Sequence, residues 1–385
     1  MNTNDSVRRR KGFLALVLLC LLPASVLVSP ALVSELIGAN NRLMFLCFVA
    51  LFLVGSFFFA RFDLRSLRYF VIWVCFLFLI NIIGALRGSP IGPAAIAFLV
   101  TSSFYGLLLC QKDNDYSPLA PVLAIFLGFY TCVLLMHVMV AYFLPNLFED
   151  FVITDTLNQS RLYKNLNGFM FIPEAFLTED GSRGAAKNRF VGFMSEPSQF
   201  AFLCALNFVF ASTLKSRVLQ WIVKSVAILG GLSTLSTTFM ILSLVFLFVR
   251  ISEKYGRLFV FLLTTALVVL IVLYFLDGFN PRNTSFLVRQ AMMAAIVESF
   301  SVGDLLFGSP AENFGYPSMW IQFLIDFGLV FCLIVAVVFY KAGFFRGDTG
   351  IIIFIFSLTL QIQIVATYVV PVLVARSISC KGRFG

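Results

Sequence analysis

The chain has 385 residues, of which 60% are hydrophobic and 12% are charged, and its mean hydropathy is +0.96. Soluble globular domains carry about 25% charged residues, so this composition excludes an ordinary soluble enzyme and indicates a polytopic membrane protein. The formal charge of +9 does not indicate nucleic-acid binding, because the basic residues recur in short connectors between apolar runs, as in cytoplasmic loops of membrane proteins.

The first part of the chain predicts five membrane-spanning helices. A basic cluster from Arg8 to Lys11 precedes an apolar run from Gly12 to about Val33. The apolar core of a secretory signal peptide has about 7–15 residues, so this longer run favours a first span with a cytoplasmic N-terminus. The next four spans are predicted at about 43–60, 69–86, 93–110 and 118–144. Counting from a cytoplasmic N-terminus, the fifth span ends on the outer face.

Residues 145–197 form the first of two long outer loops that we predict. Its mixed charges are accompanied by aromatic residues such as Tyr163 and Phe171, which favours a folded or surface-lying loop over a disordered one. The loop ends in the sequence NRFVGFMSEPSQFA, which starts at Asn188. Pro197 suits the first turn of a helix, and Glu196 would lie at the positive end of that helix dipole. We therefore expect the loop to enter a sixth span at about 198–214.

The apolar stretch 218–249 is too long for one comfortable span and contains the polar cluster Ser233–Thr238. We predict a hairpin of two short or broken helices with its polar tip in the membrane near the outer face. Irregular backbone at that depth is tolerated where it lines a protein cavity. The alternative is that the hydroxyls bond back to their own helix or join neighbouring helices, and the sequence leaves both open.

The last third predicts a span at about 258–276 and a second outer segment, 277–317. A short amphipathic helix at about 286–300 is expected to lie at the membrane surface, followed by glycines and prolines that break the chain. A span at about 318–340 returns inward, and the final run, 350–375, is one span or two short ones. The fold class is therefore all-α, a single polytopic membrane domain over 1–385 with about eleven transmembrane helices (10–12) and two long periplasmic loops.

The two outer segments each carry an arginine that is suited to an anion at the membrane interface. Arg189 leads into the sixth span, and Arg289 lies on the amphipathic helix. A guanidinium fork can hold phosphate or diphosphate oxygens in pairs, although snorkelling to lipid headgroups is the alternative role. Glu196 is a candidate general base or the ion-pair partner of an arginine. Eight cysteines without ligand spacing and the single His137 predict no metal site.

These residues resemble a known family. The pattern R-x-x-G-x-x-x-E-P at Arg189, Gly192, Glu196 and Pro197 is similar to the bacterial O-antigen and exopolysaccharide polymerases of the Wzy type. Arg289, the run Gly303–Gly308 and a span that carries Gly328 resemble the family's second periplasmic loop. The resemblance covers about residues 145–340. The chain departs from the family where many relatives have a basic residue beside the hairpin serine, because Thr237 and Thr238 stand here.

The resemblance implies a glycosyltransferase that joins undecaprenyl-diphosphate-linked repeat units into O-antigen, capsule or exopolysaccharide on the periplasmic side of the bacterial inner membrane. Arg189 and Arg289 would hold the diphosphates, and Glu196 would orient Arg189 or accept a proton. Binding positions implied at the same site are Arg161, Gly192, Ser236, Thr237 and Gly308. No cofactor is expected. The implied partners are the lipid-linked substrate, membrane lipids, a flippase and a chain-length regulator, without nucleic acid.

Two other functions are weighed against polymerisation. O-antigen ligases share the architecture but use a histidine in the second periplasmic loop, and residues 277–317 contain none. A flippase for lipid-linked glycans, or another transporter, would often show internal repeats and several ionisable residues in its spans. The chain shows no convincing repeat, and His137 and Asp326 are the clear intramembrane candidates. The polymerase is therefore the favoured hypothesis.

Overall fold

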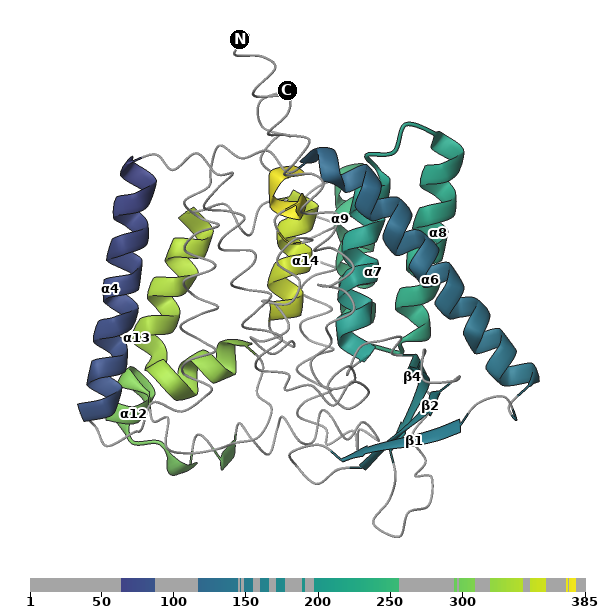
Figure 1. Ribbon diagram of the computed structural model, residues 1–385. Helices are drawn as coiled ribbons and strands as arrows, with labels where there is room; N and C mark the ends of the chain where they lie inside the picture. Colours follow the sequence, from purple (N-terminus) through teal and green to yellow (C-terminus); the bar gives the residue numbers. More distant parts are fainter. Residues whose placement is uncertain are drawn as a thin grey trace, which may run out of the picture.

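The computed structural model describes parts of the chain that form a helical bundle with a small sheet at one end (Figure 1). The described residues are 64–86, 117–144, 146, 149–154, 160–165, 171–176, 189–190, 197–255, 294–295, 298–308, 319–341, 347–357, 372 and 374–378. The helices are α4 (Leu64–Leu86), the 3-10 turn η1 (Ser117–Leu119), α6 (Ala120–Phe143), α7 (Pro197–Ala211), α8 (Arg217–Ser233), α9 (Thr237–Tyr255), α12 (Val302–Phe307), α13 (Met319–Lys341) and α14 (Gly347–Ser357).

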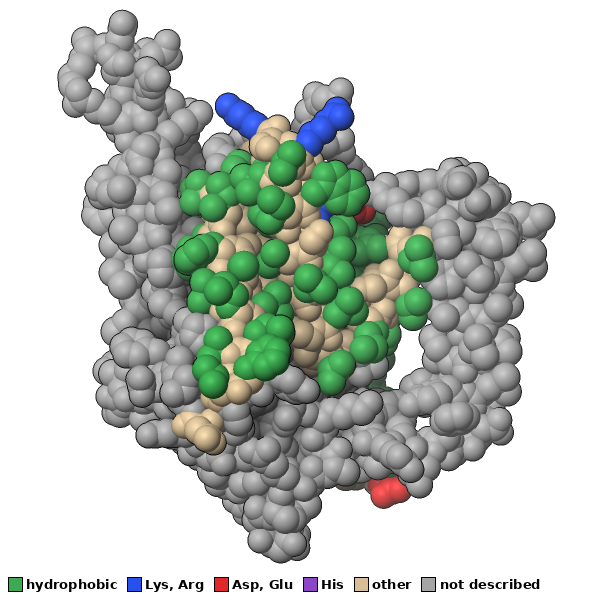
Figure 2. All heavy atoms as spheres, turned by 90° about the vertical axis from the view of Figure 1, so that its right-hand side faces the viewer, with side chains coloured by type: hydrophobic (Ala, Val, Ile, Leu, Met, Phe, Trp, Pro, Cys, Tyr) green, Lys and Arg blue, Asp and Glu red, His purple; other side chains and the backbone are tan. Residues whose placement is uncertain are grey.

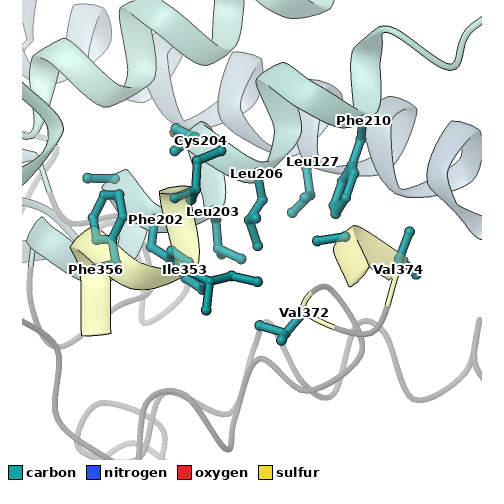
Figure 3. Close-up of a cluster of buried hydrophobic side chains, with 14 of the residues drawn as sticks. Leu127, Phe202, Leu203, Cys204, Leu206, Phe210, Ile353, Phe356, Val372 and Val374 are labelled. Atoms are coloured by element: carbon teal, nitrogen blue, oxygen red, sulfur yellow. The ribbon is translucent and has the colours of Figure 1, made fainter. Parts of the chain in front are cut away.

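Helix α7 is the centre of the bundle. Its sequence, PSQFAFLCALNFVFA, has no charged residue, and most of its residues are buried. A helix that is apolar all round is buried on all sides, and α7 packs against α6, α8, α9 and α14. Figure 3 shows Leu203 and Leu206 of α7 facing Ile353 of α14 and Val372 and Val374 near the C-terminus. These apolar contacts are the core of the described bundle.

One polar side chain in this core ties α7 to α6. Asn207 is fully buried. With its amide in the orientation that satisfies both partners, it donates to the Ala124 carbonyl and accepts from the Gly128 N–H, each at 3.2 Å. A buried amide without partners would be costly, so these bonds fix how α7 lies on α6.

The two helices of the hairpin predicted within 218–249 are confirmed as α8 and α9, with α9 extending to Tyr255, while the position of the tip in a membrane stays a prediction. Ser216 caps α8 by accepting a hydrogen bond from the Leu219 N–H at 3.4 Å. A Cβ atom added to Gly230 would lie 2.5 Å from Thr131 Cγ2, and one added to Gly231 would lie 2.1 Å from Phe239 Cζ. The two glycines therefore let α8 approach α6, α7 and α9 closely.

Helices α4, α13 and α14 are joined by aromatic contacts on the other side of the bundle. The rings of Phe76 in α4 and Phe331 in α13 stack with centroids 5.9 Å apart. Trp320 in α13 donates from Nε1 to the Ser357 hydroxyl of α14 at 2.7 Å. Helix α13 is interrupted at Gly328 (φ 77°, ψ 176°), where it turns sharply in Figure 1.

The predicted all-α class is wrong for the first long loop, which contains a four-stranded antiparallel sheet. The strands are β1 (Glu149–Thr154), β2 (Ser160–Asn165), β3 (Phe171–Phe176) and β4 (Arg189–Phe190), paired in sequence order. Short stretches such as FVIT in β1 have the branched and aromatic residues that strands favour. The rest of the described chain is helical, as predicted.

The predicted spans agree with the structure to different degrees. Those at 69–86, 118–144 and 198–214 correspond to α4, α6 and α7. The predictions at 12–33, 43–60, 93–110 and 258–276 lie outside the described residues, as does most of the amphipathic helix at 286–300.

Helix α12 was not expected, because Gly303 and Gly308 were interpreted as chain breakers. Among the described residues, one helical stretch, Phe323–Tyr340, is long and apolar enough to cross a membrane by length and composition, and shorter apolar helices accompany it.

The outer faces of the helices are apolar. Helix α8 exposes Val218, Trp221 and Leu229, and α6 exposes Phe129 and Met136. Figure 2 shows apolar side chains over most of the described part of one face, with the basic side chains gathered at its upper end. The surface of this bundle therefore lacks the polar covering that a helix usually turns toward water.

Candidate functional site

Three predicted site segments meet at one end of the bundle. The short connection between α7 and α8 makes the two helices antiparallel, so the first residue of α7 and the last residue of α8 lie at the same end. Helix α9 begins four residues after α8 ends, at this end too. Strand β4 lies against α8, and the sheet covers this end in Figure 1. Arg189, the start of α7 and the α8–α9 turn are thus brought together.

The sheet register defines the place of Arg189. In β4 it is paired with Glu174 of β3, and Glu174 is in turn paired with Tyr163 of β2. Arg161 lies in β2, paired with Ile153 of β1 and Phe176 of β3. The predicted residues Arg189 and Arg161 therefore share one sheet, but they lie two strands apart in the order β1-β2-β3-β4.

The hairpin tip, residues 233–238, contains two kinds of hydroxyl group. The Ser233 hydroxyl donates to the Gly230 carbonyl at 2.7 Å, and the Thr234 hydroxyl donates to the Gly231 carbonyl at 2.6 Å. Thr234 Oγ1 also accepts a hydrogen bond from the Ser236 N–H at 3.2 Å. These two side chains bond back to their own helix, which was one of the two alternatives that the sequence left open.

The second half of the hairpin tip is different. Leu235 has a φ of 49°, the one positive value at a described residue other than glycine. Ser236 and Thr238, which follow, are 2% and 5% exposed. Within the described part of the chain, no hydrogen bond joins either hydroxyl to a partner. A buried hydroxyl without a partner is unusual, and a left-handed leucine stores backbone strain, and both features are concentrated at functional sites.

The electrostatics of this end suit an anion. The first N–H groups of a helix have no partner within it, and the aligned peptide dipoles place positive potential there. Helices α7 and α9 both begin at this end, at Pro197 and Thr237. Arg189 in β4 adds a full positive charge to the same region. Helix N-termini together with an arginine are features that proteins use to bind phosphate oxygens.

Gly308 lies at a separate place in the molecule. It ends α12 with a φ of 83°, and a Cβ atom there would lie 2.5 Å from the Asp326 carbonyl oxygen of α13. A Cβ atom on Gly328 would lie 2.3 Å from the Leu306 carbonyl oxygen. The close backbone contact accounts for glycine at both positions, so Gly308 has a structural role that does not require a ligand.

The remaining predicted site residues, Gly192, Glu196 and Arg289, lie outside the described residues. Glu196 directly precedes α7 in the sequence, and α7 begins at the end of the bundle where the candidate site lies. Within the part of the chain that the structure describes, no group of three or more His, Cys, Asp or Glu residues is arranged to hold a metal ion.

Sequence reasoning missed Glu174. Its position beside Arg189 depends on strand pairing, and the loop was not assigned strands. The apolar and polar residues of SRLYKN, residues 160–165, do not alternate, so this segment gave no period-2 signal for β2. The signal present in the loop is the branched and aromatic run FVIT in β1. Comparison of the chain with models of known protein families, with curated proteins and with solved structures gives no match.

Proposed function

We propose that the chain is a multi-pass protein of the bacterial inner membrane that polymerises undecaprenyl-diphosphate-linked oligosaccharide repeat units by periplasmic glycosyl transfer. The observation that carries the proposal is that β4, which contains Arg189, lies against α8 in an apolar bundle whose helices α7 and α9 begin at the end where α8 finishes. In this reading the chain has about eleven membrane helices, with its N-terminus in the cytoplasm and the sheet on the periplasmic side.

The surface of the bundle supports the membrane part of the proposal. Exposed phenylalanine, leucine and tryptophan side chains would be unfavourable in water but match the hydrocarbon of a bilayer. Lys215 lies in the α7–α8 connection and Arg217 is the first residue of α8; both are exposed, at the end away from the sheet. Basic residues gather in cytoplasmic connectors, so this placement supports a sheet that faces the periplasm.

The charge at the sheet end supports a diphosphate ligand. The reacting molecule of the proposed class carries its diphosphate where the lipid meets the aqueous phase, and the candidate site lies where apolar helices meet a sheet that contains the cations Arg161, Lys164 and Arg189. An arginine and two helix starts can each donate N–H groups to phosphate oxygens. The same donors stabilise the additional negative charge that develops on the leaving diphosphate.

The proposed reaction is a displacement at the sugar carbon that carries the diphosphate. A hydroxyl of the acceptor repeat unit attacks this carbon, the bond from the carbon to the diphosphate oxygen breaks, and the electron pair leaves with the lipid diphosphate. The hydroxyl proton passes to a base, for which Glu196 at the start of α7 is the candidate. Arg189, with Arg289 from the second outer segment, would hold the two diphosphates.

Deletion of the gene followed by gel analysis of surface and lipid-linked glycans tests the proposal. A polymerase predicts single repeat units without long chains. Complementation with Arg189→Ala or Arg289→Ala should leave that pattern, whereas wild type should restore long chains. Lys164→Ala, which changes a cation elsewhere in the same sheet, is the control and should also restore long chains.

Other outcomes would replace the proposal. Long chains stranded on the lipid carrier after deletion would identify a ligase. Repeat units trapped on the cytoplasmic face would identify a flippase. An unchanged glycan profile in a cell that makes such polymers would contradict any role in this glycan.

A further inference from the structure

A row of paired residues crosses the whole sheet at the level of Arg189. Phe151 in β1 is paired with Tyr163 in β2, Tyr163 with Glu174 in β3, and Glu174 with Arg189 in β4. Directly paired residues of antiparallel strands have Cβ atoms about 4.5–5.5 Å apart and share a face of the sheet. Glu174 is therefore the acidic position nearest to Arg189 that the described part of the sheet contains.

The two members of this pair are held very differently by the backbone. Strand β4 has two residues and lies at the edge of the sheet, so Arg189 has one neighbouring strand. Glu174 lies in β3, which has neighbours on both sides. The β3–β4 pairing ends at the pair of Phe190 with Pro173, which has no N–H group to donate. The short edge strand alone constrains Arg189 little, whereas the position of Glu174 is well determined.

A register shift lies beside the same row. The pairing of β2 with β3 is regular from Arg161 to Tyr163 and shifts by one residue before Asn165. Such bulges change the direction of side chains and are frequent next to active sites. The paired position of Glu174 is thus the last regular one before the irregularity.

We propose that Glu174 is the positioning residue of Arg189, holding the guanidinium in the orientation in which it receives a diphosphate. This proposal rests on the proposed function. It replaces Glu196 in the orienting role, which leaves Glu196 as the candidate base. An arginine has five N–H donors, so it can pair with a carboxylate through one edge and still present the other to phosphate oxygens.

The test compares two carboxylates of the same sheet. Glu174→Gln keeps the size of the side chain and removes its charge. Asp150→Asn is the matched control, because Asp150 is paired with the cation Lys164 in β1 and β2, away from β4. The full-length protein would be assayed with lipid-linked repeat units, and inorganic pyrophosphate would be used as a competing anion.

Glu174→Gln is expected to lower kcat about 10–100-fold and to weaken inhibition by pyrophosphate, because a misplaced arginine serves both the leaving group and the bound anion less well. Glu174→Asp should recover part of this activity. Asp150→Asn should leave both readouts within about twofold of wild type. The exchange variant Glu174→Arg/Arg189→Glu keeps an opposite-charge pair, so it should keep the melting temperature but not the activity.

Two results would overturn the positioning role. Equal losses of activity in Glu174→Gln and Asp150→Asn would show a general effect of the sheet. Full activity and pyrophosphate inhibition in Glu174→Gln, with Arg189→Ala inactive, would show that Arg189 needs no such partner. If Arg189→Ala itself polymerises like wild type, the proposed function of this site fails, which is a distinct result.

Discussion

A helix ends or is interrupted at the hairpin tip and at the contact between α12 and α13, and the residues that change the backbone direction differ between these two places. At the hairpin tip, Leu235 adopts a positive φ and hydroxyl groups bond to nearby carbonyls. At the α12–α13 contact, Gly308 and Gly328 adopt positive φ values. The backbone of α13 lies where a Cβ atom on Gly308 would be, and the backbone of α12 lies where a Cβ atom on Gly328 would be.

The two places therefore differ in kind: the hairpin tip presents side-chain groups that could take part in binding, whereas the α12–α13 contact determines how two helices pack. The hairpin tip is made of side chains, two of them buried hydroxyls, and its backbone strain is maintained in a residue for which it is unfavourable. The α12–α13 contact is made of backbone, so nearly any side chain there is excluded. We therefore expect substitutions at the two places to differ in size and in what they change.

The largest effect is expected for Gly328→Ala. The new Cβ atom would lie 2.3 Å from the Leu306 carbonyl oxygen, at a φ of 77° that alanine disfavours. The steric and conformational penalties together should lower the free energy of unfolding by on the order of 4 kcal/mol. Thermal unfolding of the detergent-purified protein, or its folded yield, measures this.

Gly303→Ala is the matched control in α12. A Cβ atom there would meet Ser301 Oγ at 3.6 Å, an ordinary contact, within a helix that favours alanine over glycine by about 1 kcal/mol. The variant should be neutral or slightly more stable. Equal damage from Gly303→Ala and Gly328→Ala would contradict the backbone contact.

A smaller effect is expected for Gly231→Ala next to the hairpin tip. The new Cβ atom would lie 2.1–2.6 Å from ring atoms of Phe239, but a side chain can shift where a backbone cannot. The loss should be about 1–3 kcal/mol, seen as a lower melting temperature. Adding Phe239→Leu should recover part of it, and a double variant that is worse than the sum of both changes would be inconsistent with this contact.

A similar or smaller loss is expected for Asn207→Leu in the core. The substitution keeps the branched shape and the number of heavy atoms, adds some volume and removes the hydrogen bonds to Ala124 and Gly128, at a cost of about 1–2 kcal/mol. Ser212→Ala, at an exposed position just beyond the same helix, is the control and should be neutral. A stability of Asn207→Leu equal to wild type would mean that these bonds contribute little.

The smallest effect, and the one of opposite sign, is expected for Leu235→Asn. Asparagine tolerates a positive φ better than leucine, so the variant should be more stable, by up to about 1 kcal/mol. Leu232→Asn, on the exposed and helical part of α8, should instead be slightly destabilising because asparagine is a poorer helix former. A melting temperature that rises for Leu235→Asn while activity falls would indicate that the strain serves the site.

Local sequence signals predicted most of the described helices. The apolar run of α6 begins after Pro118 and ends before Pro145, so its bounds could be found to within two residues. The hairpin was predictable because one apolar stretch was too long and contained adjacent glycines. Helix α12 was missed because Gly303 was given more weight than the capping box formed by Ser301 and Asp304.

The features that were missed depend on residues far apart in the sequence. The break in α13 follows from its contact with α12, and a lone glycine in an apolar run gives no sign of it. The place of Glu174 beside Arg189 follows from strand pairing between residues that are 15 positions apart in the sequence. Of the candidate site, Arg189 and the hairpin tip were both predicted on the outer side from the order of the spans. The strand that holds Arg189, and the contact of this strand with α8, could not be predicted.

The contact of α12 with α13 also constrains the order in which the chain acquires its structure during synthesis. The four strands pair only with sequence neighbours, so the sheet can form as soon as residue 190 has been made. Helix α12 is different, because the backbone that holds it, Asp326 to Gly328, is made about twenty residues later. A nascent chain that stops before Asp326 can therefore have a complete sheet while it still lacks the α13 backbone that α12 contacts, so this contact forms after the residues of the sheet have been made.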